Sequence, residues 1–154
     1  MTDNELEKLL NLTDPDELRN LYAEAYKVKM QYIGKNVSIR GLIEISNICG
    51  KNCYYCGSGN RNLKRFRIGK EEIVETALWA YRHRFASLVL QSGEVMSEAF
   101  TDFVEEILQE ICAKTNNSVG ITLSLGEQSL ETYRRWREAG ASRYLLRIEA
   151  SDPE

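Results

Sequence analysis

Strand-like and helix-like segments alternate along this chain from residue 37 onward, and few architectures satisfy that alternation. We predict strands at 37–46, 87–91, 119–125 and 143–148, and helices at 70–83, from about 97, and at 129–139. Because the connections are short, the strands should form a parallel sheet joined by crossover helices. The expected class is therefore α/β with the order (βα)3β, and four strands are too few to close a barrel.

Two helices are expected ahead of this unit, in residues 1–36. Thr2 and Glu5 have the spacing of a capping box, and Asp14 followed by Pro15 supplies an N-cap and a proline at the first helical position. The second helix carries an apolar stripe that requires a covering surface, formed by Leu18, Leu21, Tyr22, Ala25, Val28 and Tyr32. We interpret residues 1–36 as a helical segment of its own.

The later helices also carry apolar faces. In the helix at 70–83 the predicted buried face comprises Ile73, Thr76, Ala77, Ala80 and Tyr81. In the helix after residue 97 it comprises Phe100, Phe103, Val104, Ile107, Leu108 and Ile111. Cys112 lies beside this second face, where a free cysteine behaves as a small hydrophobe, so we predict that it belongs to the core.

The last predicted strand ends at residue 148 of 154, without a helix to cover it or a partner for its outer edge. Small parallel sheets with bare edges are disfavoured. We therefore expect residues 37–154 to be the front half of a (β/α) barrel, truncated at its C-terminus. A complete small open α/β sheet is the alternative.

Charge and hydropathy argue against several classes of partner. The chain has 20 basic and 23 acidic residues and a net charge of −3, so no overall field attracts nucleic acid or an anionic membrane. No stretch approaches the roughly 20 apolar residues that span a bilayer, and the N-terminus lacks a signal-peptide pattern, which predicts a cytoplasmic protein. The basic run Arg61, Lys64, Arg65 and Arg67 matches no nucleic-acid-binding fold and is expected to be a solvated loop.

Three of the four cysteines, Cys49, Cys53 and Cys56, lie within eight residues directly after the first predicted strand. This crowding differs from the spaced cysteines of a secreted disulfide framework and favours a metal in a reducing compartment. A four-iron cluster normally takes four thiolates, so three would leave one iron open to a small chelating ligand such as S-adenosylmethionine (SAM). Such cofactors supply radical chemistry, and the protein positions them.

Zinc is the main competing metal, but a structural zinc site is closed by four ligands. Cys112 and His83 are the possible fourth ligands, and each falls on a predicted helix away from the strand ends. His83 ends its helix and is expected to interact with the terminal carbonyl groups instead. The cysteine spacing therefore favours iron and sulfide over zinc.

The arrangement Cys-x3-Cys-x-Tyr-Cys, with Tyr55 before the last cysteine, resembles the motif of the radical SAM superfamily. The resemblance implies a TIM-like barrel, a [4Fe-4S] cluster held by the three cysteines, and reductive cleavage of SAM to a 5′-deoxyadenosyl radical. Over nearly its whole length the sequence is similar to the HydE type of [FeFe]-hydrogenase maturase, in a group that includes biotin synthase and methylornithine synthase. The resembling segments are 40–47, 53–57, 89–94, 122–127 and 144–151.

The resemblance also implies roles for individual residues. The cofactor-binding positions that it implies are Tyr55, Gln91, Ser92, Gly93, Glu94, Thr122, Ser124 and Glu149. Segment 91–94 corresponds to the one that contacts the amino group of SAM, and Arg147 is similar to an arginine that lines the substrate cavity. Most of these groups follow the C-terminal end of a predicted strand, where the active sites of (β/α) barrels lie. Arg40 and Glu44 share one face of the first strand and are candidates for a buried pair.

The resemblance implies that the protein is an enzyme of hydrogenase H-cluster assembly. The expected substrate is a small molecule or an organometallic precursor, and the expected partners are a low-potential electron donor and other hydrogenase maturation proteins. Two alternatives stay open: a biotin synthase-like or methylornithine synthase-like enzyme, and an inactive truncated iron-sulfur-binding module. The family chain is longer, so part of the SAM and substrate site would come from further strands.

Overall fold

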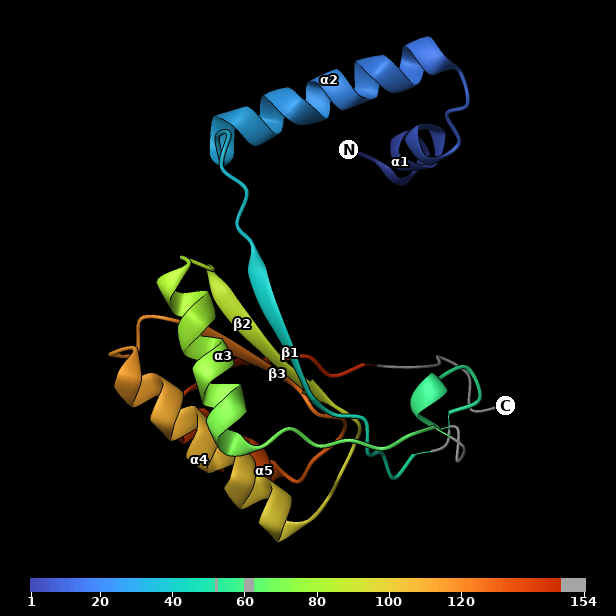
Figure 1. Ribbon diagram of the computed structural model, residues 1–154. Helices are drawn as coiled ribbons and strands as arrows, with labels where there is room; N and C mark the ends of the chain where they lie inside the picture. Colours follow the sequence, from blue (N-terminus) through green and yellow to red (C-terminus); the bar gives the residue numbers. More distant parts are fainter. Residues whose placement is uncertain (52, 60–62, 148–154) are drawn as a thin grey trace. The chain divides into compact units, whose positions relative to one another are not determined.

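The computed structural model describes residues 1–51, 53–59 and 63–147 (Figure 1). The chain divides into two compact units, Met1–Val37 and Ser38–Glu154. Glu149 and Arg61, both named above, lie outside the described residues, as does the end of the fourth predicted strand.

The first unit consists of helices α1 (Asp3–Leu10) and α2 (Pro15–Tyr32). Both predicted helix starts are confirmed. The amide of Glu5 donates to the Thr2 hydroxyl at 3.3 Å while the Thr2 amide donates to the Glu5 carboxylate at 2.6 Å, which completes the capping box. Neither helix has a buried residue within the described chain. In the apolar stripe of α2, Leu18 and Leu21 are half-buried and the other four residues are exposed.

The second unit is built on a parallel sheet in the order β1-β2-β3-β4. Its strands are β1 (Arg40–Ser46), β2 (Ser87–Ser92), β3 (Gly120–Ser124) and β4 (Ala141–Tyr144). Residues alternate across the sheet, so Ile43, Leu88 and Ile121 turn one way into the core, and their neighbours turn the other way. This second face carries the polar groups near the strand ends.

Two predicted strand boundaries are wrong. The first strand begins at Arg40 rather than residue 37, because its ladder starts only where Arg40 meets Ser87 of β2. The fourth begins at Ala141 and ends at Tyr144, instead of running over 143–148. Ala141 pairs with Ile121, and a register shift follows. The Leu145 amide still donates to the Leu123 carbonyl at 2.8 Å, but Leu145 and Leu146 lie outside the strand.

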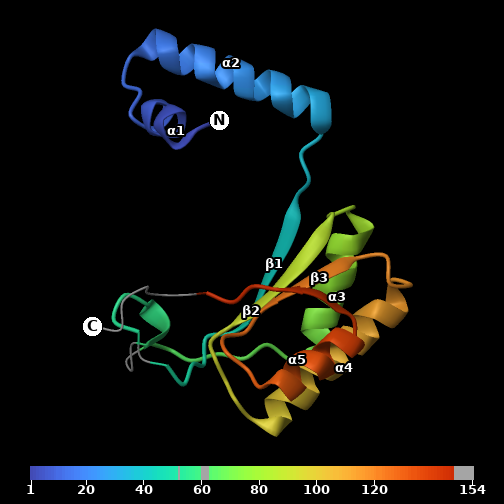
Figure 2. The ribbon, with the colours of Figure 1, turned by 180° about the vertical axis from the view of Figure 1, so that it is seen from behind.

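Three helices cover one face of the sheet, as Figures 1 and 2 show together. They are α3 (Lys70–Arg82), α4 (Glu98–Lys114) and α5 (Leu130–Glu138), and a short 3-10 turn spans Gly57–Gly59. The predicted buried face of α3 is partly wrong, because Thr76 and Tyr81 are exposed and Val74 is buried in their place. In the described part of the chain, no helix is both long and apolar enough to cross a membrane.

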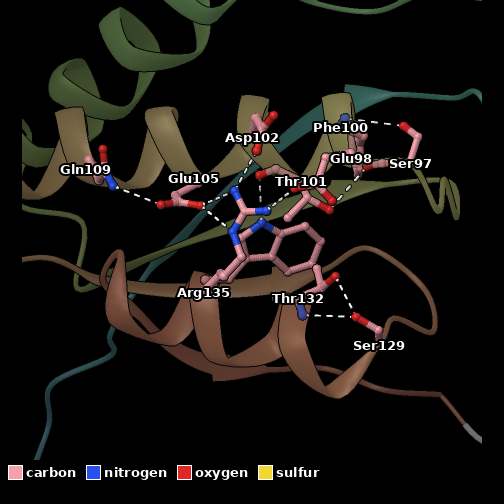
Figure 3. A network of polar contacts seen from close by, with 11 residues as sticks. Ser97, Glu98, Phe100, Thr101, Asp102, Glu105, Gln109, Ser129, Thr132 and Arg135 are labelled. Atoms are coloured by element: carbon pink, nitrogen blue, oxygen red, sulfur yellow. Dashed lines mark hydrogen bonds and ion pairs between the residues drawn. The ribbon is translucent and has the colours of Figure 1, made fainter.

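Helices α4 and α5 are joined by a polar network that surrounds the guanidinium of Arg135 (Figure 3). Arg135 donates to the carboxylates of Glu98 and Asp102 at 2.5 Å each and to Glu105 at 2.5 and 2.8 Å. The pKa of Arg135 is raised, first by its hydrogen bond to Asp102 and then by that to Glu105. Beside this network the buried indole of Trp136 donates to the Thr101 carbonyl at 3.0 Å.

Candidate functional site

A cavity of about 590 Å³ opens at the carboxyl ends of the strands. Its walls come from the cysteine loop after β1 and from the segments after β2, β3 and β4. Of the predicted site residues, it gathers Cys49, Cys53, Cys56, Tyr55, Gln91, Ser92, Gly93, Glu94, Ser124 and Arg147. Its size falls within the range of roughly 300–1,000 Å³ that small-molecule sites occupy.

Thr122 is the one described site candidate that the cavity does not include among its lining residues. It lies buried on β3, two residues before Ser124, and its hydroxyl has no hydrogen-bond partner among the described residues. A buried hydroxyl without a partner is uncommon in a folded protein.

The cysteine loop is fixed at its base by buried Asn47. The Asn47 amide group donates to the Lys64 carbonyl at 2.8 Å and accepts from the Phe66 amide at 2.8 Å. Ser46 adds a hydrogen bond from its hydroxyl to the Phe66 carbonyl at 3.0 Å. The segment that follows the cysteine loop is thereby hydrogen-bonded to the residues that precede the loop.

Cys49 is held against the segment that follows β2. The amide of Glu94 donates to the Cys49 sulfur at 3.3 Å, and the Gly50 amide donates to the Glu94 carbonyl at 2.8 Å. A Cβ on Gly93 would lie 2.5 Å from the Cys49 Cβ and nearer still to the Ile48 carbonyl oxygen. Only glycine allows the two backbone segments to approach this closely.

The other two thiols are more open. Cys53 is half-buried and Cys56 is exposed, and the Cys56 amide donates to the Cys53 carbonyl at 3.1 Å. All three thiols face the one cavity, but within residues 1–51, 53–59 and 63–147 no three His, Cys, Asp or Glu side chains converge closely enough to hold a metal ion. Tyr55 is 68% exposed beside them.

Lys51, between the first two cysteines, pairs with two carboxylates from neighbouring loops. Its ammonium lies 2.9 Å from the Glu127 carboxylate and 3.6 Å from that of Glu94. Its pKa is raised, first by the hydrogen bond to Glu127 and then by the charge of Glu94, so the group stays charged at neutral pH. No periodicity or motif in the sequence indicated this contact. The sequence offered one signal for it: a lysine lies between two of the predicted ligand cysteines, and acidic residues follow the next two strands.

Glu94 is further held by the loop after β3. Its carboxylate accepts from the Glu127 amide at 2.8 Å. The preceding Gly126 has a φ of 77°, and a Cβ there would lie 2.5 Å from the Glu94 Cβ. Tyr144 supports the same loop from β4, because its hydroxyl donates to the Gly126 carbonyl at 2.7 Å. Burial raises the pKa of Tyr144, which keeps this donor protonated.

The floor of the cavity is a row of side chains across three strands. Glu44 of β1 pairs in register with Gln91 of β2, and Gln91 with Ser124 of β3. Arg147 reaches this row and donates to the Gln91 side-chain oxygen at 3.4 Å. The suggested pair between Arg40 and Glu44 is wrong, since both side chains are exposed and no ion pair joins them. Arg40 lies at the opposite, amino end of the strand, too far along it to meet Glu44.

The remaining sequence candidates that the structure describes do not line the cavity. His83 interacts with the Trp79 carbonyl at 2.8 Å, as predicted for a helix end, and Cys112 is buried in the core. In the basic run, Arg65 donates to the carbonyls of Asn47 and Ser58, and Arg67 lies over the ring of Phe100. Arg65 and Arg67 therefore contact other residues of the same chain.

A parallel α/β unit with three cysteines at the carboxyl edge of its sheet is the arrangement expected of a cofactor-dependent (β/α)-barrel enzyme. The family model of the radical SAM superfamily matches residues 43–154, and the chain belongs to this superfamily. The HydE subunit of the [FeFe] hydrogenase maturase of Thermotoga maritima is 43% identical over 153 residues, which covers 96% of this chain and 42% of the relative. A 3-methylornithine synthase of Methanosarcina barkeri is 31% identical over 160 residues, 100% of this chain and 44% of the relative.

A solved structure gives the same assignment for the fold. The crystal structure of methylornithine synthase matches with a TM-score of 0.81 and 30% identity, covering 94% of this chain and 43% of that one. The predicted partial radical SAM barrel is therefore confirmed. The chain spans less than half the length of the curated relatives it matches. Membership of the superfamily implies a [4Fe-4S] cluster and SAM.

Proposed function

We propose that this chain is the cluster-binding part of a radical SAM enzyme, in which Cys49, Cys53 and Cys56 hold a [4Fe-4S] cluster and leave one iron for SAM. The observation that carries the proposal is that all three thiols line one cavity together with the 91–94 segment and Arg147. When bound and reduced, the cluster would supply the electron that cleaves SAM to a 5′-deoxyadenosyl radical. The remaining chemistry lies in how the chain binds and orients these groups.

The chemistry of the residues that line the cavity suits this cofactor pair. Three sulfur ligands suit an iron-sulfur cluster, and the described cavity wall lacks the fourth Cys or His that would close a structural zinc site. The Glu94 amide already donates to the Cys49 sulfur, a kind of hydrogen bond that adjusts cluster potentials. The carboxylates of Glu94 and Glu127 offer acceptors for a ligand ammonium group, and Arg147 offers a donor for a ligand carboxylate.

The other predicted site residues have corresponding roles in this proposal. Tyr55 would pack near the adenine, and Gln91, Ser92 and Ser124 would offer polar atoms along the cavity floor. Thr122, with its unpartnered hydroxyl, would contribute only where a ligand or water reaches it. Glu149 remains a candidate SAM carboxylate outside the described residues.

For the biological role we propose a HydE-like function in [FeFe]-hydrogenase H-cluster assembly. The support is the 43% identity to the maturase subunit, against 31% for the methylornithine synthase. A small-molecule or organometallic substrate, a low-potential electron donor and other maturation proteins belong to this role. A biotin synthase-like or methylornithine synthase-like activity, and a cluster-binding segment without activity, are the alternatives that the same experiments distinguish.

Anaerobic reconstitution with iron and sulfide, followed by reduction in the presence of SAM, tests the proposed function. We expect bound iron, and release of methionine and 5′-deoxyadenosine by the complete protein. Complementation of a strain that lacks its hydrogenase maturase then tests the HydE-like role, and rescue of a biotin auxotroph tests the first alternative. Iron binding without SAM cleavage in the complete protein would favour the inactive module.

A further inference from the structure

The carboxylate of Glu94 is nearly buried, and a buried charge needs compensation. Its side chain is 12% exposed. Within the described residues its only cationic partner is Lys51, and an uncompensated buried carboxylate is strongly unfavourable. The compensation of this negative charge therefore depends on where the Lys51 ammonium lies.

The two oxygens of Glu94 differ in how they are used. Oε2 accepts a hydrogen bond from the Glu127 amide at 2.8 Å, so one oxygen is fixed by the backbone. Oε1 lies 3.6 Å from the Lys51 nitrogen, which is beyond the length of a normal hydrogen bond. Since Glu94 and Lys51 both line the cavity, Oε1 is an acceptor there that a closer donor can take.

Lys51 has a second partner that does not depend on Glu94. Its ammonium is hydrogen-bonded to the Glu127 carboxylate at 2.9 Å, and the Lys51 and Glu127 side chains are 50% and 65% exposed. The three side chains Lys51, Glu94 and Glu127 carry one positive and two negative charges, a formal sum of −1. One further cation would bring the group to neutrality.

We propose that Lys51 is an exchangeable counter-ion for Glu94: it compensates the carboxylate in the ligand-free chain, releases Oε1 to the ammonium group of an entering ligand, and stays paired with Glu127. This inference rests on the proposed function for the identity of that ligand, SAM. Lys51 is then a positioning residue of the cysteine loop. Because it competes for Oε1, it weakens the binding of ligands that carry an ammonium group and leaves the binding of other ligands unchanged.

A double-mutant cycle in the cofactor-free chain tests the pair without any ligand. Lys51→Met and Glu94→Gln are combined, and unfolding is followed in urea. We expect the two changes to be coupled by about twofold to fivefold in the unfolding equilibrium constant, the range of a partly exposed ion pair. Additive effects would overturn the proposal even if the cluster and SAM bind normally. Lys70→Met, which removes an ion pair outside the cavity, is the matched control and should not couple to Glu94→Gln.

Ligand binding by the reconstituted protein tests the exchange. The probes are SAM and 5′-methylthioadenosine, which has no ammonium group. Because Lys51→Met removes a competing cation, SAM should bind about twofold to fivefold more tightly, while the affinity for 5′-methylthioadenosine stays unchanged. Equal effects on both probes, or weaker SAM binding by Lys51→Met, would overturn the proposal. Failure of the unmodified protein to bind iron would instead contradict the proposed function, and the cofactor-free cycle separates the two.

Discussion

Replacing Gly93 by alanine should loosen the contact between the cysteine loop and the segment after β2. The added Cβ would lie 2.5 Å from the Cys49 Cβ and 2.8 Å from the Ile48 carbonyl carbon, and real Cβ atoms do not approach backbone this closely. One of the two segments must move, and overpacking of this kind costs about 1–3 kcal/mol. For a chain of this size, that corresponds to a fall in melting temperature of about 2–12 °C.

Thermal unfolding of the cofactor-free chain measures the loss of stability, and anaerobic reconstitution measures how much iron the variant binds. Iron content should fall with Gly93→Ala because Cys49 is displaced. Gly57→Ala is the matched control, since a Cβ on Gly57 meets no atom within 4 Å. If Gly93→Ala melts with the wild type and binds as much iron, the close approach of these segments is not as described.

Three further predictions concern the loop after β3, the network between α4 and α5, and the core. Gly126→Ala should lose about 1–3 kcal/mol of unfolding free energy in urea titrations, because its φ of 77° disfavours other residues and the Cβ would lie 2.5 Å from that of Glu94; equal stability would contradict it. Arg135→Met should lower the melting temperature, by less at high salt, because screening already weakens its three carboxylate contacts; a loss independent of salt would count against this network. Burial raises the pKa of Cys112 in the folded protein. The neutral thiol therefore contributes fully to the free energy of unfolding below the ordinary thiol pKa of about 8.5, and this contribution is lost as the pH rises through the pKa of the folded state. Alkylation at pH 8 should therefore modify Cys53 and Cys56 first, and rapid modification of Cys112 would show that it is not buried.

The order of strands and helices was predictable because each element carries a local signal. Ser97 and Ser129 accept hydrogen bonds at the starts of α4 and α5, and the i, i+3, i+4 pattern of α4 lies in the core. Strand ends were less predictable, since they depend on pairing: β4 starts where Ala141 meets Ile121, a contact that the sequence does not reveal.

The candidate site likewise has features that were predictable from the sequence and features that were not. Cys49, Cys53 and Cys56 are visible because their spacing is local, and the positions after each strand follow from the geometry of a parallel sheet. Contacts between loops were not predictable. The pairing of Lys51 with Glu127 joins residues 76 positions apart, and the support of Gly126 by Tyr144 depends on the register of β4.

The most direct test of the central claim is the iron content and spectroscopy of the oxygen-free protein, with and without SAM. We expect about four irons for each chain, a spectrum that changes when SAM is added, and loss of both in Cys53→Ala. Cys112→Ala, which removes a core thiol outside the cavity, should retain them. Zinc without iron, or a cluster whose every iron is bound by a side chain and whose spectrum SAM leaves unchanged, would contradict it.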